Sequence, residues 1–297
     1  MSTFKRTAFT LIELLVVIVI IGILSSLILV SIGNVNNKVN IARGQAFADS
    51  SKNYLGSHLV SDWKLDGNAA DKWGVNNGSI VGSATILSGN DCVQGSCINF
   101  DGIDDYLNMG SNPSLNFSAD YTIEMFVYNG AGSLSYPTLI SRAGQSKTNG
   151  YFWIFTQGTN EVDIRGQWSN GSVISNYYFY NVLPKDKWTH LAFNFTNSNK
   201  VLNLYVNGVK NSNPVTLTGA LPVDDSTLYF GSYTGNVSSY AFKGRMDEIQ
   251  WYNDNLSSHI IKEHYYSALN KLFIKEKISK EEYFSFISQE NNKYGKY

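Results

Sequence analysis

Acidic side chains are the residues of this 297-residue sequence that could do acid–base chemistry. Glu161 and Asp163 alternate along a run of β-forming residues, so their carboxylates would share one face of a strand. Retaining hydrolysis of a glycosidic bond needs two carboxyl groups about 5 Å apart. Arg165 and Gly166 follow instead of a further acid, so we interpret the pair as a solvated strand face. Glu124 alternates with apolar neighbours and is interpreted as a surface or inter-sheet polar residue.

No other catalytic motif accompanies these carboxylates. The sequence contains neither G-x-S-x-G nor HExxH, and its histidines, at positions 58, 190, 259 and 264, are scattered. His190 lies within an apolar run, which favours a hydrogen-bonded residue of a sandwich over a ligand. The net charge of −1 gives no electrostatic reason to expect a nucleic-acid partner. We therefore expect a protein that is not an enzyme.

A further acid, Glu13, lies inside an apolar run that extends from residue 9 to residue 32. As a helix this run would be roughly 36 Å long, enough to cross a hydrocarbon core of about 30 Å. Lys5 and Arg6 precede it and hold its start on the cytoplasmic side. The chain after the run is therefore expected outside the cytoplasm. The alternatives are a secretory signal peptide, a plain membrane anchor, or a Glu13 that sits at the membrane interface.

The residues around Glu13 carry a specific resemblance. The stretch KRTAFTLIEL, residues 5–14, resembles the class III leader of type IV pilins and type II secretion pseudopilins. The resemblance implies that a prepilin peptidase cuts between Ala8 and Phe9 and that the new terminus is N-methylated. Glu13 is then the fifth mature residue, and its carboxylate can pair with the terminal amine of a neighbouring subunit. That family nearly always has Gly where Ala8 stands, so we expect cleavage at lower efficiency.

The residues from about 60 to 252 have the pattern of a β-sheet protein. Short alternating or apolar runs are separated by Gly, Asn, Asp and Ser, which are typical of strands joined by turns. The pattern predicts an antiparallel sandwich or barrel, with a type I′ turn at Asn207-Gly208. The candidate strands are residues 121–128, 151–155, 188–195, 201–206 and 226–230.

Six phrases in this region, taken together, resemble the laminin G-like, concanavalin A-like jelly roll of bacterial surface proteins. They are WKLDGN (63–68), the Gly/Asn-rich 74–78, NFDGIDDYL (99–107), KWTHLA (187–192), LYVNG (204–208) and GRMDEIQWYN (244–253). The resemblance implies two antiparallel sheets with a curved face. That fold hosts sugar-binding modules, adhesion modules and glycosidases, so it does not name the function. The endoglucanase signature of the superfamily, Glu-x-Asp-x-x-Glu or a form one residue shorter, begins at Glu161 and is not completed.

The same resemblance implies a structural calcium ion. In relatives of this jelly roll, Ca²⁺ often joins the first and last strands through acidic side chains and backbone carbonyls, which are ligands that it prefers. Asp66 and Asp247 match the acidic positions of the first and last phrases. The alternative is that both residues only cap turns. Asp101, Asp104 and Asp105 form a denser cluster, which we expect to shape the turn before a strand. No organic cofactor is expected.

Cys92 and Cys97 enclose four residues, and Gly95 allows the chain to reverse between them. Since the membrane argument places this region in an oxidising space, we expect a disulfide bond. So short a loop would stabilise the fold by only about 2 kcal/mol. Metal binding by two cysteines with no histidine nearby is not expected.

Helical spacing frames the β-rich region on both sides. An apolar stripe over residues 35–46 predicts that the first helix continues, or that a partly helical stalk follows it. Another stripe covers residues 256–272, and a second tail helix is expected from Ser279 to Glu290. The predicted fold class is α+β: a long N-terminal membrane-spanning helix, an all-β antiparallel jelly-roll sandwich and a short C-terminal helical tail. The predicted domains are the leader 1–8, the helix 9–57, the jelly roll 58–255 and the charged tail 256–297.

The two resemblances together predict a pilin-like filament subunit, a minor one because its head is large, whose lectin-type head serves adhesion or binds carbohydrate or another surface. The alternatives are a type II secretion pseudopilin, a membrane-anchored glycosidase, which the missing carboxylate pair disfavours, and a purely structural head. The expected partners are the prepilin peptidase, other pilin-like subunits, the inner-membrane assembly machinery and a glycan or surface protein. Before assembly the chain would span the inner membrane with its head outside, and later lie in an extracellular filament or a periplasmic pseudopilus.

The ligand of the head is not identified by the sequence. Aromatic faces suit the apolar surfaces of sugar rings, so Trp153, Trp168 and the pair Tyr177-Tyr178 are candidates for stacking. The same residues suit the core, and alternation alone does not say which face is inside.

Overall fold

The computed structural model describes residues 11–12, 14–23, 25, 53–116, 119–130, 136–143, 151–157, 161–169, 174–218, 226–234, 239–274 and 280–281. The chain divides into two compact units, Met1–Ser57 and His58–Tyr297. In the first unit, residues 11–12, 14–23 and 25 are helical with exposed side chains. None of the helices in the described ranges has both the length and the apolar character needed to cross a membrane. Ala8, Phe9 and Glu13 lie outside the described residues.

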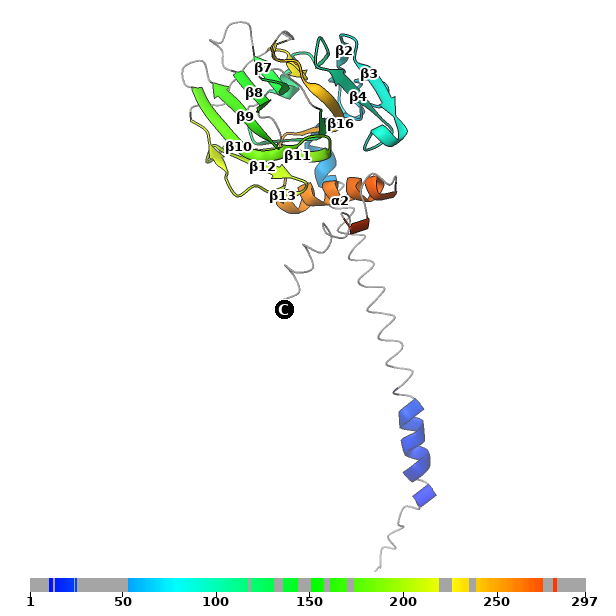
Figure 1. The fold of residues 1–297 in the computed structure, drawn as a ribbon. Helices are drawn as coiled ribbons and strands as arrows, with labels where there is room; N and C mark the ends of the chain where they lie inside the picture. The colour runs from blue at the N-terminus through cyan, green and yellow to red at the C-terminus, as the bar shows by residue number, and fades with distance from the viewer. Residues whose placement is uncertain are drawn as a thin grey trace, which may run out of the picture. The chain divides into compact units, whose positions relative to one another are not determined.

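The second unit is a β-sandwich with one helix against it (Figure 1). Its elements are β1 (Leu59–Trp63), β2 (Ser79–Val81), β3 (Thr85–Ser88), η1 (Gly89–Asp91), β4 (Ser96–Asp101), β5 (Tyr106–Asn108), η2 (Pro113–Leu115), β6 (Tyr121–Asn129), β7 (Thr138–Ala143), β8 (Tyr151–Gln157), β9 (Glu161–Ser169), β10 (Ile174–Pro184), β11 (Trp188–Thr196), β12 (Val201–Val206), β13 (Val209–Lys210), β14 (Val215–Thr216), β15 (Leu228–Phe230), β16 (Lys243–Tyr252) and α2 (Ser258–Ile274).

The strands form two antiparallel sheets. Sheet A has the order β13-β12-β11-β6-β16-β4-β3, with β1 paired to β16 and β14 paired to β12. Sheet B has the order β10-β9-β8-β7-β15-β5-β2. The first and last strands of the sandwich are neighbours, since Trp63 on β1 lies opposite Ile249 on β16. The all-β antiparallel sandwich predicted from the sequence is confirmed.

The core lies between the sheets because inward and outward residues alternate along each strand. On β6, Ile123, Met125 and Val127 face inward, and on β8, Phe152 and Ile154 do so; all five are fully buried. A slip of one residue in register would move such a set to the opposite face, so the buried face specifies the register. The predicted turn at Asn207-Gly208 joins β12 to β13, and both residues have positive φ, +50° and +73°. Positive φ at both central residues is the requirement of a type I′ turn.

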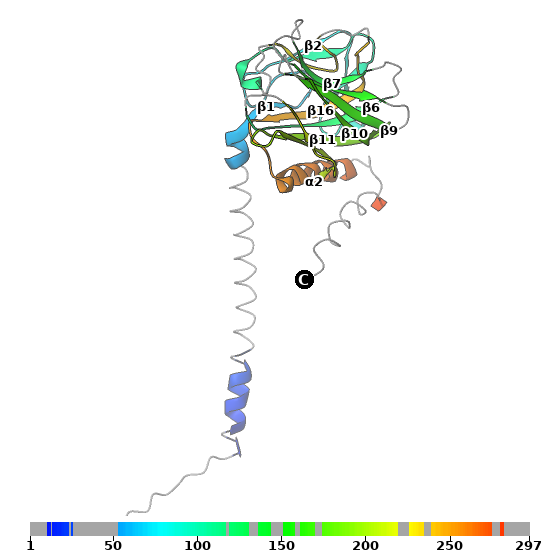
Figure 2. The ribbon, with the colours of Figure 1, turned by 90° about the vertical axis from the view of Figure 1, so that its left-hand side faces the viewer.

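Helix α2 covers the outward side of sheet A, as Figures 1 and 2 show. The helical spacing predicted after residue 255 is therefore confirmed. A second apolar cluster fills the contact and contains Val93, Phe126, Tyr265, Ala268, Leu269 and Leu272. The N–H of Leu256, just before the helix, donates to Thr122 Oγ1 on β6 (3.0 Å). Strand β6 is consequently buried on both faces. Of the predicted second tail helix, only residues 280–281 are described, and both are helical.

Candidate functional site

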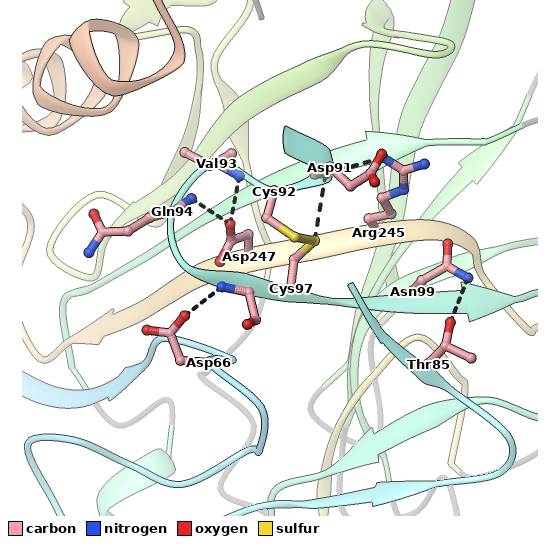
Figure 3. The surroundings of a disulfide bond; sticks show 11 residues. Asp66, Thr85, Asp91, Cys92, Val93, Gln94, Cys97, Asn99, Arg245 and Asp247 are labelled. Carbon is pink, nitrogen blue, oxygen red and sulfur yellow. Dashed lines mark hydrogen bonds and ion pairs between the residues drawn. A yellow bond between two sulfur atoms is a disulfide. The ribbon is translucent and has the colours of Figure 1, made fainter. Parts of the chain in front are cut away.

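The loop between η1 and β4 is closed by a disulfide bond (Figure 3). The Sγ atoms of Cys92 and Cys97 are 2.06 Å apart, and both residues are fully buried. Gly95, with φ +51°, has no side chain where the carboxylate of Asp66 approaches; a Cβ there would lie 1.9 Å from Asp66 Oδ1. The left-handed backbone and the close carboxylate both favour glycine at this point of the loop.

The two acids predicted as calcium ligands both bind the backbone of this disulfide loop (Figure 3). Asp247 Oδ2, on β16, accepts the N–H groups of Val93 (2.8 Å) and Gln94 (3.0 Å). Asp66 Oδ1, just after β1, accepts the N–H of Ser96 (2.6 Å). The fold thus brings the first and last motifs to opposite ends of one short loop, and their carboxylates anchor it.

Asp247 is fully buried, and burial together with the charge of Glu248 raises its pKa to about 8. Its Oδ1 atom has no hydrogen-bond partner. Calcium takes six to eight oxygen ligands, whereas the groups that face Asp247 Oδ2 and Asp66 Oδ1 are N–H donors. These two oxygen atoms therefore anchor the loop, and a calcium ion held by Asp66 and Asp247 stays a prediction.

Asp101, Asp104 and Asp105 shape the turn before β5, as the sequence suggests. Asp105 Oδ2 accepts the N–H of Asp101 (2.8 Å), and Asp101 Oδ1 accepts the N–H of Ile103 (2.7 Å). Each of the three residues contributes one carboxylate oxygen to a group of atoms that all lie within 4.8 Å of one another. Burial raises the pKa of Asp105, and the charges of Asp101 and Asp104 raise it further. This turn is the place in the described chain where three carboxylates converge.

Glu124 is not exposed on a strand but buried beneath α2. Its Oε2 atom lies 2.6 Å from His264 Nδ1, which comes from the helix, while its Oε1 atom has no hydrogen-bond partner. Burial alone would lower the pKa of His264, but the charge and hydrogen bond of Glu124 raise it above its usual value. The pair joins α2 to β6.

His190 lies on β11 and its ring packs against α2. Its ring is buried between Phe126 (centroids 4.9 Å apart) and Tyr265 (6.0 Å), and its Nδ1 atom makes no hydrogen bond. Burial lowers its pKa to about 4, so the ring is neutral at pH 7. His190 acts as an aromatic packing residue under α2.

Asp163 lies on the outward side of sheet B and is paired. Its Oδ2 atom binds Arg165 Nη2 at 2.8 Å, and its Oδ1 atom accepts the N–H of Asn181 at 3.0 Å. The side chain of Glu161 lies outside the described part of the chain. The contacts of Asp163 are those of a structural ion pair on the sheet surface.

The outward side of sheet B combines aromatic and hydrogen-bonding side chains, and we call it the aromatic face. The register places Phe155, Arg165 and Tyr178 in one row across β8, β9 and β10. A second row contains Trp153, Gln167 and Asn176, in which Gln167 Nε2 donates to Asn176 Oδ1 (3.0 Å). Together with Asp163 and Tyr180, these residues define the aromatic face.

Two tyrosines on β10 are exposed members of this face. Tyr178 is 42% exposed and Tyr180 61% exposed, and their rings are nearly parallel, with centroids 6.2 Å apart and planes inclined by 9°. The guanidinium of Arg165 lies 5.4 Å from the centre of the Tyr178 ring. Flat exposed rings flanked by hydrogen-bonding groups are suited to stack on a ligand that has an apolar side and a polar rim.

The other predicted aromatics occupy different environments. Trp153 is buried against Phe155 (centroids 4.2 Å apart) and donates through Nε1 to Thr138 Oγ1 (2.9 Å). Its ring therefore packs within the aromatic face and is not exposed for stacking on a ligand. Tyr177 points into the core and donates to the carbonyl of Trp153 (3.1 Å), since neighbours on a strand face opposite ways. The side chain of Trp168 lies outside the described residues. Tyr180 is not among the aromatic residues predicted from the sequence, although its spacing of two from Tyr178 places both on the same side of a strand.

Two family models match the chain. Residues 101–262 match the concanavalin A-like lectin/glucanases superfamily, and residues 3–29 match the prokaryotic N-terminal methylation motif. The first match covers more than half of the chain, which therefore belongs to the concanavalin A-like lectin/glucanases superfamily. The chain also carries the methylation motif of pilin-type proteins. A search of curated proteins finds no match.

Solved structures with the same fold include domains of an arabinanase, a mosquitocidal protein and a neurotoxin. Domain 4 of AbnA, a GH43 extracellular arabinanase from Geobacillus stearothermophilus, in complex with arabinotriose, has a TM-score of 0.54 and 18% identity, over 69% of this chain and 97% of that one. The binding domain of Paraclostridial Mosquitocidal Protein 1 has a TM-score of 0.59 and 17% identity, over 73% and 53%. The receptor binding domain of botulinum neurotoxin C/D mosaic serotype has a TM-score of 0.56 and 12% identity, over 72% and 52%. The chain spans about half of the two toxin domains, and at these identities the similarity shows the fold alone.

Proposed function

We propose that the chain is a minor pilin-like filament subunit whose jelly-roll head binds carbohydrate at the aromatic face. The methylation motif at residues 3–29 supports the filament part of the proposal. Prepilin peptidase would cut between Ala8 and Phe9, and Glu13 would pair with the terminal amine of an adjacent subunit. The prepilin peptidase, other pilin-like subunits and the assembly machinery of the inner membrane are the partners that this route requires. The head would then be displayed outside the cytoplasm.

The observation that carries the binding part is the exposed pair Tyr178 and Tyr180 beside Arg165. Parallel rings offer an apolar platform for the C–H side of a sugar, and Arg165, Gln167 and Asn176 provide donors and acceptors for hydroxyl groups. The arabinanase domain of the same fold is seen with arabinotriose, which supports an oligosaccharide as the ligand class. Membership of a superfamily that is named for lectins and glucanases also supports a carbohydrate as the ligand class.

A glycan array tests the binding proposal. The second unit, residues 58–297, is applied as the wild type, as Tyr178→Ala/Tyr180→Ala, and as Trp73→Ala, a control at another exposed aromatic (56% exposed). Loss of two stacking rings is expected to weaken binding about tenfold or more, while Trp73→Ala binds like the wild type. Equal binding by all three proteins would refute a role for the aromatic face.

Purification of surface filaments tests the filament proposal. The chain is expected in the isolated filaments at low abundance, beside a more abundant subunit. Its presence only in a periplasmic pseudopilus would instead identify it as a type II secretion pseudopilin. A chain that stays in the membrane and enters neither assembly would contradict the proposal.

A further inference from the structure

A cavity of ≈ 420 Å³ lies on the outward side of sheet A, on the opposite face of the sandwich from the aromatic face. Tyr265, Leu269 and Leu272 of α2 form one wall of this cavity. Strands β6, β11 and β16 form another wall, and η1 with the loop before β11 lines its edge. The volume lies within the range of about 300–1,000 Å³ that is usual for sites of small ligands.

The strand wall is a row of three side chains fixed by the sheet register. Arg245 on β16 lies opposite Tyr128 on β6, which lies opposite Trp188 on β11. The guanidinium of Arg245 is 4.7 Å from the centre of the Tyr128 ring, and the Tyr128 and Trp188 rings meet edge to face with centroids 5.8 Å apart. Three neighbouring strands therefore hold the row in place. It presents ring surfaces and one fixed cation to the cavity.

The charges around the cavity balance. Arg245 Nη1 binds Asp91 Oδ1 at 3.1 Å, and the exposed residues Asp186 and Lys187 add one charge of each sign. Asn90, Thr189 and Asn207 are the uncharged polar residues of the lining, and Asn207 Oδ1 also accepts the N–H of His190 (2.9 Å). Because no net charge faces the cavity, it offers no electrostatic preference for an anion or a cation.

We propose that this cavity is a second ligand site of the head, which binds a neutral saccharide unit between the aromatic row and α2. A sugar ring matches the lining because it has an apolar C–H side, hydroxyl groups around its edge and no charge. Tyr128, Trp188 and the leucines of α2 would cover the apolar side, and Arg245, Asp91 and the asparagines would bind hydroxyl groups. The inference deepens the proposed carbohydrate binding, and it assigns a separate site on the other sheet.

The test uses the full-length chain in a detergent without a sugar headgroup. The chain is titrated with glucose, galactose, mannose, N-acetylglucosamine and arabinotriose. Binding at the cavity is followed by NMR through the indole N–H signal of Trp188, which is assigned by its absence in Trp188→Phe. Binding stoichiometry is measured by calorimetry on the same samples.

Three variants separate the two sites. Asn90→Trp places a large side chain at the exposed edge of the cavity, and Ile86→Trp is its control at an exposed position of β3 that does not line the cavity. Tyr178→Ala/Tyr180→Ala removes the rings of the aromatic face. Thermal melting of each variant shows that it is folded.

At least one saccharide of the panel is expected to shift the Trp188 signal in the wild type, in Ile86→Trp and in the double tyrosine variant. Asn90→Trp is expected to abolish this shift while it keeps any binding at the aromatic face. Loss of all saccharide binding in the double tyrosine variant would overturn the second site and leave the proposed function intact. Retained binding that only Asn90→Trp abolishes would support the cavity and reject the aromatic face. No binding of any of the five saccharides at millimolar concentration would overturn both.

Discussion

At the scale of single residues, Asp247 illustrates how one buried carboxylate can organise a loop. It accepts two backbone N–H groups of the disulfide loop from a strand more than 150 positions later in the chain. The disulfide bond between Cys92 and Cys97 closes the same loop covalently. The loop is therefore held at three places: by the disulfide, by Asp247 and by Asp66.

The first prediction concerns this carboxylate. Asp247→Ala leaves the buried N–H of Val93 without its acceptor, so the free energy of unfolding should fall by about 1–3 kcal/mol. Asp247→Asn keeps an oxygen at the same place and should cost much less. The raised pKa of about 8 means that the folded chain retains a proton that the unfolded chain loses above about pH 4. As the pH rises from 4 to 8, the free energy of unfolding of the wild type should therefore fall relative to that of Asp247→Asn. Urea titrations at several pH values measure both.

The second prediction concerns the pair Glu124 and His264. Glu124→Gln removes the charge that raises the pKa of His264. Among the other nearby charges, Lys64 lowers this pKa and Glu263 raises it, both to a smaller extent. Because the pKa of His264 is higher in the folded state, protonated His264 stabilises the fold fully below about pH 6.5. This stabilisation is lost as the pH rises through the pKa of the folded state. At pH 5.5 the free energy of unfolding of the wild type should exceed that of Glu124→Gln by about 1.5–3 kcal/mol. This difference should be smaller at pH 9. A difference that stays constant with pH would show that the pair contributes through packing alone.

At the scale of elements, α2 is part of the sandwich and not a separate tail. It covers the outward side of sheet A with its own apolar cluster, and it carries one half of the pair with Glu124. The predicted boundary at residue 255 therefore marks a change of secondary structure, while the compact unit continues past it. Tyr265, Leu269 and Leu272 of this helix also form one wall of the proposed cavity.

The third prediction tests that view of α2. Leu269 is 1% exposed, so Leu269→Ala should lower the free energy of unfolding of the head by about 2–4 kcal/mol. Ser267→Ala, an exposed position two residues away, should change it by less than about 0.5 kcal/mol. Chemical denaturation followed by tryptophan fluorescence measures both. A small effect of Leu269→Ala would mean that the helix docks weakly and folds independently of the sandwich.

At the scale of the whole molecule, two compact units with different sequence signatures follow each other along the chain. The first carries the methylation motif, and the second carries the superfamily fold with its aromatic face. Such an arrangement suits a subunit whose N-terminal segment enters an assembly while its head binds a ligand. The two tasks can be disrupted one at a time, which makes the proposal testable in cells.

The fourth prediction concerns assembly. Glu13→Gln removes the proposed partner of the neighbouring terminal amine, so incorporation into filaments should fall about tenfold or more, whereas Glu13→Asp keeps a carboxylate and part of the incorporation. Both variants should still be cut before Phe9, because the change lies after the cleavage site. Mass spectrometry of the mature terminus and immunoblots of sheared filaments provide the measurements. An intact Met1 in the wild-type protein would contradict the proposed processing.

The fold was accessible from the sequence because its signals are local. Alternation along β6, β11 and β12 and the turn at Asn207-Gly208 each depend on a few consecutive residues, and the structure confirms them. The methylation motif is also a contiguous stretch, so the family comparison finds what the residues indicate. Cys92 and Cys97 are five positions apart, and their pairing follows from that proximity once an oxidising compartment is assumed.

The site depended on contacts that no local pattern contains. Alternation could not say that Tyr177 faces the core and Tyr178 the solvent, because the choice rests on which side the second sheet packs. Glu124 meets His264 across 140 positions, and Asp247 meets Val93 across 154. The sequence by itself indicated five of the strands, the turn at Asn207-Gly208, the family and the methylation motif. Only the tertiary structure decided which carboxylates are buried, which aromatic rings are exposed and where a cavity forms, since these depend on how distant segments pack together.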